Sequence, residues 1–243
     1  MANAENPRLA ILIDADNAQA SVFHDLLVEV SRYGTATVKR AYGDWTTPNL
    51  KGWKDILHTM AIQPIQQFSY TTGKNSTDAS LIIDAMDLLH SGALDGFCLV
   101  SSDSDFTRLA TRVREAGLVV YGFGEKKTPQ PFVAACDKFI YTEILRPGKS
   151  PAEDNQPAAA KIKSQLLDAI SAAMRDDGWA PLSAVGSMLV KNDPAFDSRS
   201  FGYPKLGALV RNQRYLDVKD VPNEPGSTMV QLYVRPKGNS KEA

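Results

Sequence analysis

Short apolar runs alternate with stretches of helical periodicity over the first 145 residues of the chain. The runs LAILI at 9–13, GFCLV at 96–100 and LVVYGF at 118–123 are typical of strands buried on both faces. Between them, apolar residues recur every three or four positions, which predicts helices. The pattern predicts strands over 9–14, 35–42, 62–68, 96–100 and 118–123, and helices over 18–32, 48–59, 77–91 and 105–116. This alternation predicts an α/β fold with a parallel sheet and right-handed crossovers.

The pattern changes after a polar, proline-containing stretch, RPGKSPAEDNQPAAA at 146–160, which predicts a linker. Beyond it, the apolar spacing predicts helices over 161–174, 182–189 and 203–211, then short strands over 215–218 and 229–234. Three helices and a two-stranded wing indicate a small winged-helix (α+β) domain, a class that often docks on nucleic acid. We therefore expect domains at 1–145 and 161–236, the linker 146–160 between them, and a tail at 237–243.

The composition changes this picture little. Apolar residues make up 43% and charged residues 23% of the chain, as in ordinary soluble proteins. No apolar run approaches the roughly 20 residues of a membrane helix, and the start MANAENPRL lacks the features of a secretory signal. Cys98 and Cys136 are isolated, which favours a reduced compartment. We expect a cytoplasmic protein with no membrane partner.

The net charge is −1, with a slightly acidic first part and a slightly basic second part. Neither part is basic enough to attract nucleic acid through its overall field. Any contact with nucleic acid is therefore expected to come from local patches.

Acidic side chains follow two of the predicted buried strands. Asp14 ends the first strand, and Asp103 and Asp105 come just after the strand at 96–100. Asp78 lies in the first turn of a predicted helix. Ligands of parallel sheets bind beyond the carboxyl ends of the strands, so these acids converge if the two strands are neighbours.

Such a cluster of like charges needs a neutralising cation. Its donors are all oxygen, which favours Mg²⁺ or Mn²⁺ and not zinc. A divalent ion held in this way suits phosphodiester or phosphoryl chemistry, because it lowers the pKa of a bound water and clamps the attacked phosphate.

Helix capping is the competing explanation for individual acids. Asp16 or Asn17 would cap the helix predicted to begin near Ala18, and Asp78 and Asp105 would favour the dipoles of their helices. Asp14 resists this explanation, because a carboxylate directly after a buried strand is costly without a partner. Two acids further along the predicted helix, Asp84 and Asp87, lie on other faces than Asp78; the role of Asp84 is open, and Asp87 reads as a solvated acid.

Three blocks, LIDADN, KNSTDASLIIDAMDLL and LVSSDSDFTRLATRVREAGLVVYGFG, resemble in sequence and order the signature blocks of NYN domains. These are PIN-like nucleases of the LabA-like group, and the resemblance covers residues 9 to 145. It implies a PIN-like three-layer α/β/α sandwich with a mostly parallel sheet and a metal-dependent ribonuclease site. By this resemblance the metal ligands and catalytic acids are Asp14, Asp78, Asp103 and Asp105, with Asn17 as a catalytic polar partner. Supporting roles are expected for Asp16, Lys74, Asp84 and Ser101.

The second part resembles the OST-HTH/LOTUS domain, most specifically in FDSRSFGYPKLGALV at 196–210. This resemblance implies a winged helix that binds single-stranded or structured RNA, and some members of the family bind proteins instead. Most of its aromatic residues read as core. Phosphate contacts favour mobile cations and unpaired bases favour an exposed ring, so the expected RNA-binding residues are Arg199, Tyr203, Lys205, Arg211 and Arg214.

Together these features predict a Mg²⁺- or Mn²⁺-dependent ribonuclease whose C-terminal domain recruits RNA. Basic residues expected to steer the RNA backbone near the acids are Lys39, Arg40, Lys74, Arg108 and Arg112. Two alternatives stay open: a non-catalytic RNA-binding scaffold with a degenerate nuclease domain, and a metal-dependent phosphatase of small molecules. PIN-like domains are often dimeric, so the resemblance also allows a homodimer.

Overall fold

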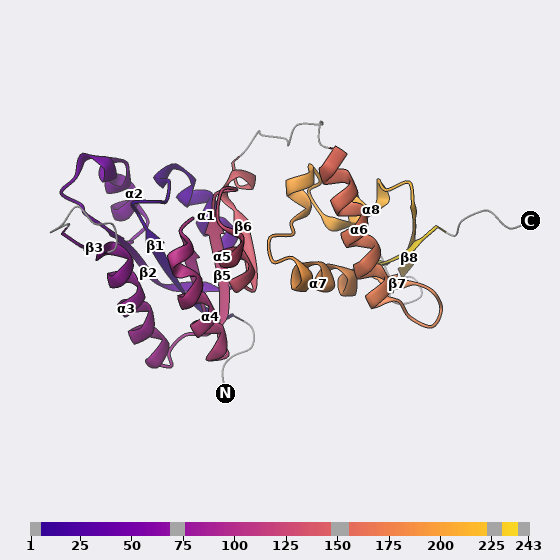
Figure 1. Ribbon diagram of the computed structural model, residues 1–243, viewed down its shortest axis with the longest axis horizontal. Coiled ribbons are helices and arrows are strands. Elements are labelled where there is room, and N and C mark those ends of the chain that lie inside the picture. Colours follow the sequence, from indigo (N-terminus) through magenta and orange to yellow (C-terminus); the bar gives the residue numbers. More distant parts are fainter. Residues whose placement is uncertain (1–5, 69–75, 147–155, 223–229, 238–243) are drawn as a thin grey trace, which may run out of the picture. The chain divides into compact units, whose positions relative to one another are not determined.

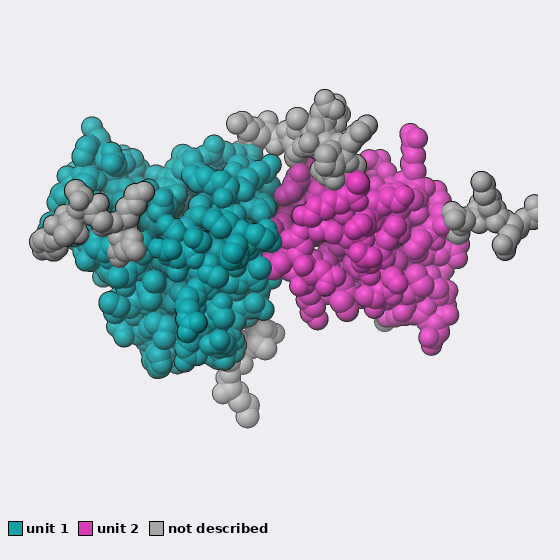
Figure 2. Space-filling model, in the orientation of Figure 1, with its two compact units in different colours: residues 1–149 teal, residues 150–243 magenta. Residues whose placement is uncertain are grey.

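Two hydrophobic cores organise the chain. The computed structural model describes residues 6–68, 76–146, 156–222 and 230–237, which Figure 1 shows as ribbons. Contacts divide the chain into two units, Met1–Lys149 and Ser150–Ala243, coloured separately in Figure 2. Each unit has a core of its own, and each is described by itself.

The first unit is built on a six-stranded sheet in which every neighbouring pair is parallel. Its strands are β1 (Arg8–Asp14), β2 (Thr35–Gly43), β3 (Gln63–Gln66), β4 (Gly96–Val100), β5 (Val119–Gly124) and β6 (Lys138–Tyr141). Their order in space is β3-β2-β1-β4-β5-β6. The strand order reverses between the two central strands, β1 and β4. The carboxyl ends of these strands are therefore the switch point, where ligands of such sheets bind.

Helices cover both faces of this sheet, which gives the α/β/α layers (Figure 1). On one face, Ile11 and Ile13 of β1 share a core cluster with Phe23 and Leu26 of α1 (Phe23–Val30), and α2 (Lys54–Thr59) packs against the same cluster. The other face is covered by α3 (Ser76–His90), α4 (Thr107–Glu115) and α5 (Gln130–Ala135), which contact the sheet or one another. Because side chains alternate along a strand, Asp14 lies on the opposite face to Ile13, the face that α3 covers.

Three predicted helices are preceded by 3-10 segments; one such segment is Ser104–Phe106, before α4, where a helix over 105–116 was expected. In place of a helix over 18–32, a 3-10 turn at Ala20–Val22 precedes α1, and the residue before that turn, Gln19, makes no capping bond with its side chain. The expected capping by Asp16 or Asn17 is therefore wrong. A 3-10 segment, Pro48–Trp53, likewise precedes α2; it contains Gly52, whose low helix propensity weakens a regular helix.

The sequence pattern missed α5 and β6. Both are short, and α5 follows Pro129 and carries Pro131 in its first turn. Proline fits the first turn of a helix, but it breaks the apolar periodicity that a pattern search relies on.

The second unit combines three helices with a small antiparallel sheet. The helices are α6 (Gln156–Ala173), α7 (Leu182–Asn192) and α8 (Leu206–Arg211), and the strands are β7 (Ala180–Pro181), β8 (Leu216–Pro222) and β9 (Val230–Pro236). Their order is β7-β9-β8, so the wing has three strands and not the two that were expected. Its core includes Leu166, Ile170, Val185, Leu209 and Val234.

Two helices of this unit begin at other residues than predicted. Helix α6 begins at Gln156, inside the predicted linker 146–160, because proline fits a first turn and the alanines at 158–160 favour a helix. The helix expected over 203–211 is shorter, since Gly202 has a φ of 81° and ends a preceding turn at Ser198–Phe201.

Candidate functional site: an acidic cleft at the switch point

The strand ends that carry the acids are neighbours. Strands β1 and β4 pair in parallel, with Ile13 opposite Val100. The residues that follow, Asp14 and Ser101, therefore leave the sheet side by side at the switch point. The condition on which the convergence of the acids depended, that these two strands are neighbours, is therefore met.

Asp14 is buried, with 1% of its surface exposed, and its carboxylate accepts three hydrogen bonds. The Ser101 hydroxyl donates to Oδ2 at 2.7 Å, and the Asn17 side-chain amide donates to the same oxygen at 2.8 Å. The Asn17 backbone N–H donates to Oδ1 at 3.3 Å. Burial raises the pKa of Asp14, while these donors act in the opposite direction. Asp14 is thus held in one orientation at the base of the site.

Three other acids form a close cluster. Carboxylate oxygens of Asp78, Asp103 and Asp105 lie within 4.8 Å of one another. Asp78 comes from the first turn of α3, and the other two come from the segment after β4. The Asp103 side chain accepts the Asp105 backbone N–H at 3.0 Å and so caps the 3-10 turn Ser104–Phe106. Asp103 is therefore the cap, and Asp105 lies in the first turn, where the sequence placed it.

The cluster is electrostatically strained. Burial raises the pKa of Asp78 to about 6, and the negative charges of Asp14, Asp103 and Asp105 add to the effect. Asp78 is 8% exposed, whereas Asp105 is exposed, so the cluster opens from a buried end towards solvent.

A cleft of about 630 Å³ lies beside the cluster, and Asp78 and Asp103 of the cluster line it. Its walls include Asp14, Asp16, Asn17, Asp78 and Asp103, so four of the predicted site acids and the predicted amide face one hollow. Asp14 lies beside the cluster of three and not within it; its Oδ2 accepts from Ser101 and Asn17, and its Oδ1 accepts from the Asn17 N–H.

Asp16 ties the loop after β1 to the start of α3. Its Oδ2 accepts the Thr77 hydroxyl at 3.1 Å. Thr77 is itself buried. The sequence did not single it out, and only its position directly before Asp78 could have indicated a role. This contact fixes the first turn of α3, and with it Asp78, relative to the end of β1.

The donor set fits a divalent cation. Three carboxylates offer only oxygen ligands, which suits Mg²⁺ or Mn²⁺ and not zinc. Burial is the main cause of the raised pKa of Asp78, and a cation among the acids would remove the repulsion that adds to it. Asp78, Asp103 and Asp105 are therefore the residues that could hold a metal.

Asp84 belongs to a different contact. Its Oδ2 accepts from Arg40 at 2.9 Å and from the Tyr42 hydroxyl at 2.8 Å, which joins α3 to β2. Lys39 donates to the Met60 carbonyl at 2.5 Å. The sequence placed Lys39 and Arg40 among the residues that steer RNA, but both are engaged in these contacts.

Two of the other predicted basic residues lie near the acids. Arg108 and Arg112 of α4 line a hollow of about 520 Å³ that also includes Asp105. Lys74, the remaining one, lies outside the described residues.

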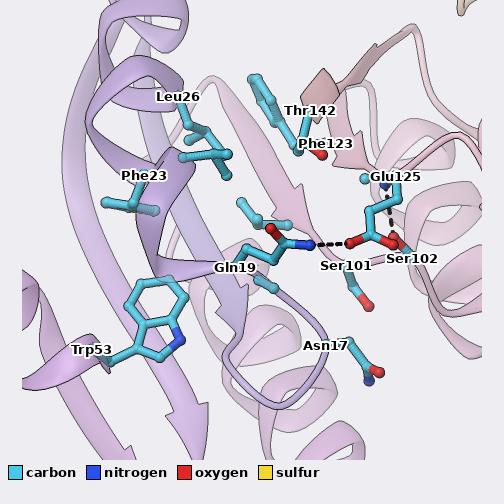
Figure 3. A pocket seen from close by; sticks show the side chains of 14 residues that line it. Asn17, Gln19, Phe23, Leu26, Trp53, Ser101, Ser102, Phe123, Glu125 and Thr142 are labelled. Carbon is cyan, nitrogen blue, oxygen red and sulfur yellow. Dashed lines mark hydrogen bonds between the residues drawn. The ribbon is translucent and has the colours of Figure 1, made fainter. Parts of the chain in front are cut away.

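An apolar cavity adjoins the acidic cleft on the α1 side of the sheet (Figure 3). Phe23, Leu26 and Trp53 line it, and Gln19 donates to Glu125 at 2.7 Å across its edge. Its volume of about 10 Å³ is barely that of one water molecule, so it is a packing gap and not a ligand pocket.

The predicted RNA-binding side chains of the second unit are largely engaged within it. Arg199 contacts Asp197 at 2.7 Å, and Arg211 contacts Asp220 at 2.5 Å. The Tyr203 hydroxyl accepts a hydrogen bond from Asn212. The remaining two, Lys205 and Arg214, are exposed.

The fold and the site define a doubly wound α/β protein with an acidic cleft at its switch point. The chain belongs to the NYN domain family, whose sequence model matches residues 8–145. The model of the OST-HTH/LOTUS domain matches residues 158–228. The chain therefore joins a domain of the nuclease superfamily to a domain associated with RNA binding, and the predicted two-domain architecture and fold class are confirmed.

Solved structures similar to the chain include the three that follow. A protein of unknown function from Vibrio parahaemolyticus is 19% identical, with a TM-score of 0.49 over 57% of this chain and 94% of its own. An uncharacterized protein from Nitrosomonas europaea is 30% identical, with a TM-score of 0.30 over 40% of this chain and 92% of its own. A Chromobacterium violaceum protein is 33% identical, with a TM-score of 0.27 over 38% of this chain and 94% of its own. A search of curated proteins found no match.

Within the described parts of the chain, no helix combines the length and the apolar character needed to cross a membrane.

Proposed function

We propose that this protein is a Mg²⁺- or Mn²⁺-dependent ribonuclease whose second unit binds the RNA. The observation that carries the proposal is the convergence of Asp78, Asp103 and Asp105 within 4.8 Å at the switch point of the sheet. Membership of the NYN family supports nuclease chemistry at that position, and the OST-HTH/LOTUS match supports RNA as the substrate.

Asp78, Asp103 and Asp105 would hold the ion. When bound, it supplies positive charge for the attacked phosphate and an activated water at neutral pH. The protein contributes a fixed geometry, because the Asp103 carboxylate is held by the Asp105 N–H and α3 is tied to the loop after β1 through Thr77 and Asp16. Such pre-organisation of charged groups is a large part of catalysis at phosphates.

Asp14 acts as the anchor of the site in this proposal. Its Oδ2 receives Ser101 and Asn17, and the Ser101 oxygen in turn accepts the Asp103 N–H at 3.1 Å. Through Ser101, the end of β1 therefore sets the position of the Asp103 backbone.

Basic residues next to the acids would guide the RNA backbone. Arg108 and Arg112 lie along the hollow that begins at Asp105, where positive charge offsets the repulsion between the acidic cleft and phosphate. RNA bound by the second unit is held close to the first unit because the two are linked. Its effective concentration at the acidic cleft is therefore raised without new contacts in the first unit. The two cysteines are free and buried, which fits the reducing cytoplasm in which we place the protein.

Cleavage of labelled RNA tests the proposal. Purified protein is incubated with single-stranded and structured RNA in Mg²⁺, in Mn²⁺ or in chelator, and with a phosphomonoester in parallel. We expect RNA cleavage that needs the metal and is lost in Asp103→Asn, a variant whose amide oxygen still caps the turn.

Three other outcomes contradict the proposal in different ways. RNA binding without cleavage in either metal indicates a non-catalytic scaffold. Release of phosphate from the monoester without RNA cleavage indicates a small-molecule phosphatase. Cleavage that persists in Asp103→Asn indicates a contaminant or a different site.

A further inference from the structure

The outer face of the sheet in the second unit gathers aromatic rings and cations. The register pairs Lys219 of β8 with Tyr233 of β9, and Asp217 with Arg235. Val218 and Val234, which alternate with them, point into the core. The four side chains therefore share the face that the helices leave uncovered, and Trp179, directly before β7, joins them there.

These side chains contact one another as a continuous cluster, which we call the wing cluster: Arg175, Trp179, Lys219, Tyr233 and Arg235. Lys219 Nζ lies 4.2 Å from the centre of the Trp179 ring and 5.5 Å from that of Tyr233. Arg235 lies 4.4 Å from the Trp179 ring, and Arg175 lies 5.7 Å from the Tyr233 ring.

A tight turn presents Trp179 and Arg175 at the edge of this face. Gly178 has a φ of 76°, and the Arg175 N–H donates to the Trp179 carbonyl at 3.0 Å. The Asp177 side chain accepts the Trp179 N–H at 3.1 Å. These hydrogen bonds fix the backbone of the turn at both ends. The positions of Arg175 and Trp179 are therefore set by the fold.

The wing cluster contains three cations, Arg175, Lys219 and Arg235, and the turn beside it carries two exposed acids, Asp176 and Asp177. Asp217 contacts Arg235 at 3.2 Å, and in the described residues no ion pair involves Arg175 or Lys219. By contrast, on the helix side of β8, Arg211 is paired with Asp220 at 2.5 Å. Arg175 and Lys219, which have no carboxylate partner among the described residues, thus lie on the sheet face with Tyr233.

Rings among mobile cations are the features that bind unpaired bases with their phosphates. Stacking of a base on an aromatic ring is generally stronger than an exposed cation–π contact, so a base can replace a cation over Trp179 or Tyr233. The displaced Lys219 and Arg235 are then available to phosphate oxygens. A duplex hides the faces of its bases and offers nothing for these rings to stack on.

We propose that the wing cluster is the surface on which this protein binds unpaired bases of single-stranded RNA, with Trp179 and Tyr233 stacking on bases and Arg175, Lys219 and Arg235 contacting phosphates. The inference rests on the proposed function for the choice of RNA. It places the RNA on the sheet, and not on the helix-side residues Arg199 and Arg211, whose charges are already paired.

Fluorescence anisotropy of the full chain with a labelled single-stranded RNA of about 15 nucleotides tests the inference. Chelator is present throughout, so that cleavage does not interfere. Tyr233→Leu is expected to weaken binding roughly 5- to 150-fold, and Tyr233→Phe, which keeps the ring, to bind like the wild type. Lys219→Gln and Arg235→Gln are each expected to lower the salt slope of binding by about 0.7.

Lys191→Gln is the matched control, because Lys191 is an exposed cation on α7 in the same unit and outside the cluster. Thermal unfolding of each variant separates lost binding from lost folding. The inference is overturned if Arg211→Gln weakens binding while the cluster variants do not, if a duplex binds as well as the single strand, or if the wild type binds a protein partner but no RNA. Binding that depends on the cluster in a protein that does not cleave RNA would sustain the inference and refute only the nuclease proposal.

Discussion

The Ser101 hydroxyl donates a 2.7 Å hydrogen bond to the carboxylate of Asp14, across 87 residues of sequence and at the point where β1 and β4 end together. Asp14 is 1% exposed and Ser101 is 3% exposed, so water cannot replace this bond. The contact links the two strand ends on which the acidic cleft is built.

Replacement of Ser101 by alanine is predicted to destabilise the protein. A buried carboxylate that loses one donor should cost about 1–3 kcal/mol in the free energy of unfolding, measured by urea denaturation. The pKa of Asp14, already raised by burial, should rise further. Ser104→Ala, at an exposed position in the same segment, is the control and should leave stability unchanged. Equal stability of both variants would show that Ser101 does not support Asp14.

Replacement of Asp78 by asparagine is predicted to stabilise the metal-free protein at neutral pH. The folded-state pKa of Asp78 is about 6 against an ordinary 3.8, so between these values the folded protein binds a proton that the unfolded chain does not. The stability of the wild type should therefore fall as pH rises from about 4 to about 6, and stay lower above that. A gain of about 1 kcal/mol in the variant corresponds to about 2–4 °C in Tm.

Thermal unfolding in chelator at several pH values measures this effect. The difference between Asp78→Asn and the wild type should be full above pH 6 and should disappear near pH 4. A variant less stable than the wild type at pH 7.5 would contradict the cost of burying Asp78 among other acids, from which the gain is predicted.

Addition of Mg²⁺ or Mn²⁺ is predicted to raise the Tm of the wild type. An ion that binds only the folded state stabilises it by about 2.7 kcal/mol at a concentration one hundred times its Kd. Asp78→Asn and Asp103→Asn should show little or no increase, although Asp78→Asn starts from a higher Tm in chelator. The same increase in the wild type and both variants would place the ion elsewhere.

Asp84 is predicted to matter for stability and not for metal binding. Asp84→Asn weakens the contacts with Arg40 and with the hydroxyl of Tyr42, a fully buried residue. The variant should lose about 1–3 kcal/mol in the free energy of unfolding. The Tm increase on addition of Mn²⁺ should be retained. A loss of that increase, with folding intact, would make Asp84 part of the metal site.

The alternation of apolar strands and helices was sufficient to predict the layers of the first unit, and the acids at strand ends pointed to Asp14, Asp78, Asp103 and Asp105. Sequence alone could not establish that β1 and β4 are neighbours, since that pairing joins residues more than eighty positions apart. It also could not show that Asp14 is occupied by Ser101 and Asn17, because hydrogen bonds across the fold leave no local pattern.

The wing cluster illustrates a signal that was present and not used. In YLDVKDV, apolar residues alternate with Asp217 and Lys219, and in QLYVRP they alternate with Tyr233 and Arg235. This alternation predicts that these four side chains face outward. Trp179 carries no such mark, because the two-residue strand that follows it is too short to show a period. Only the folded sheet brings it beside Lys219 and Arg235.

The central claim is that the protein cleaves RNA with a divalent ion held by its clustered acids. The most direct test compares variants of Asp78 and Asp87, two acids of the same helix. Asp78 lies in the cluster, whereas Asp87 is exposed on α3 and outside the cluster. The measurement is the rate of RNA cleavage in Mn²⁺ by the wild type, Asp78→Asn and Asp87→Asn. We predict a loss of at least roughly 100-fold in Asp78→Asn and an unchanged rate in Asp87→Asn. Equal rates in the three proteins, or no cleavage by the wild type, would contradict the claim.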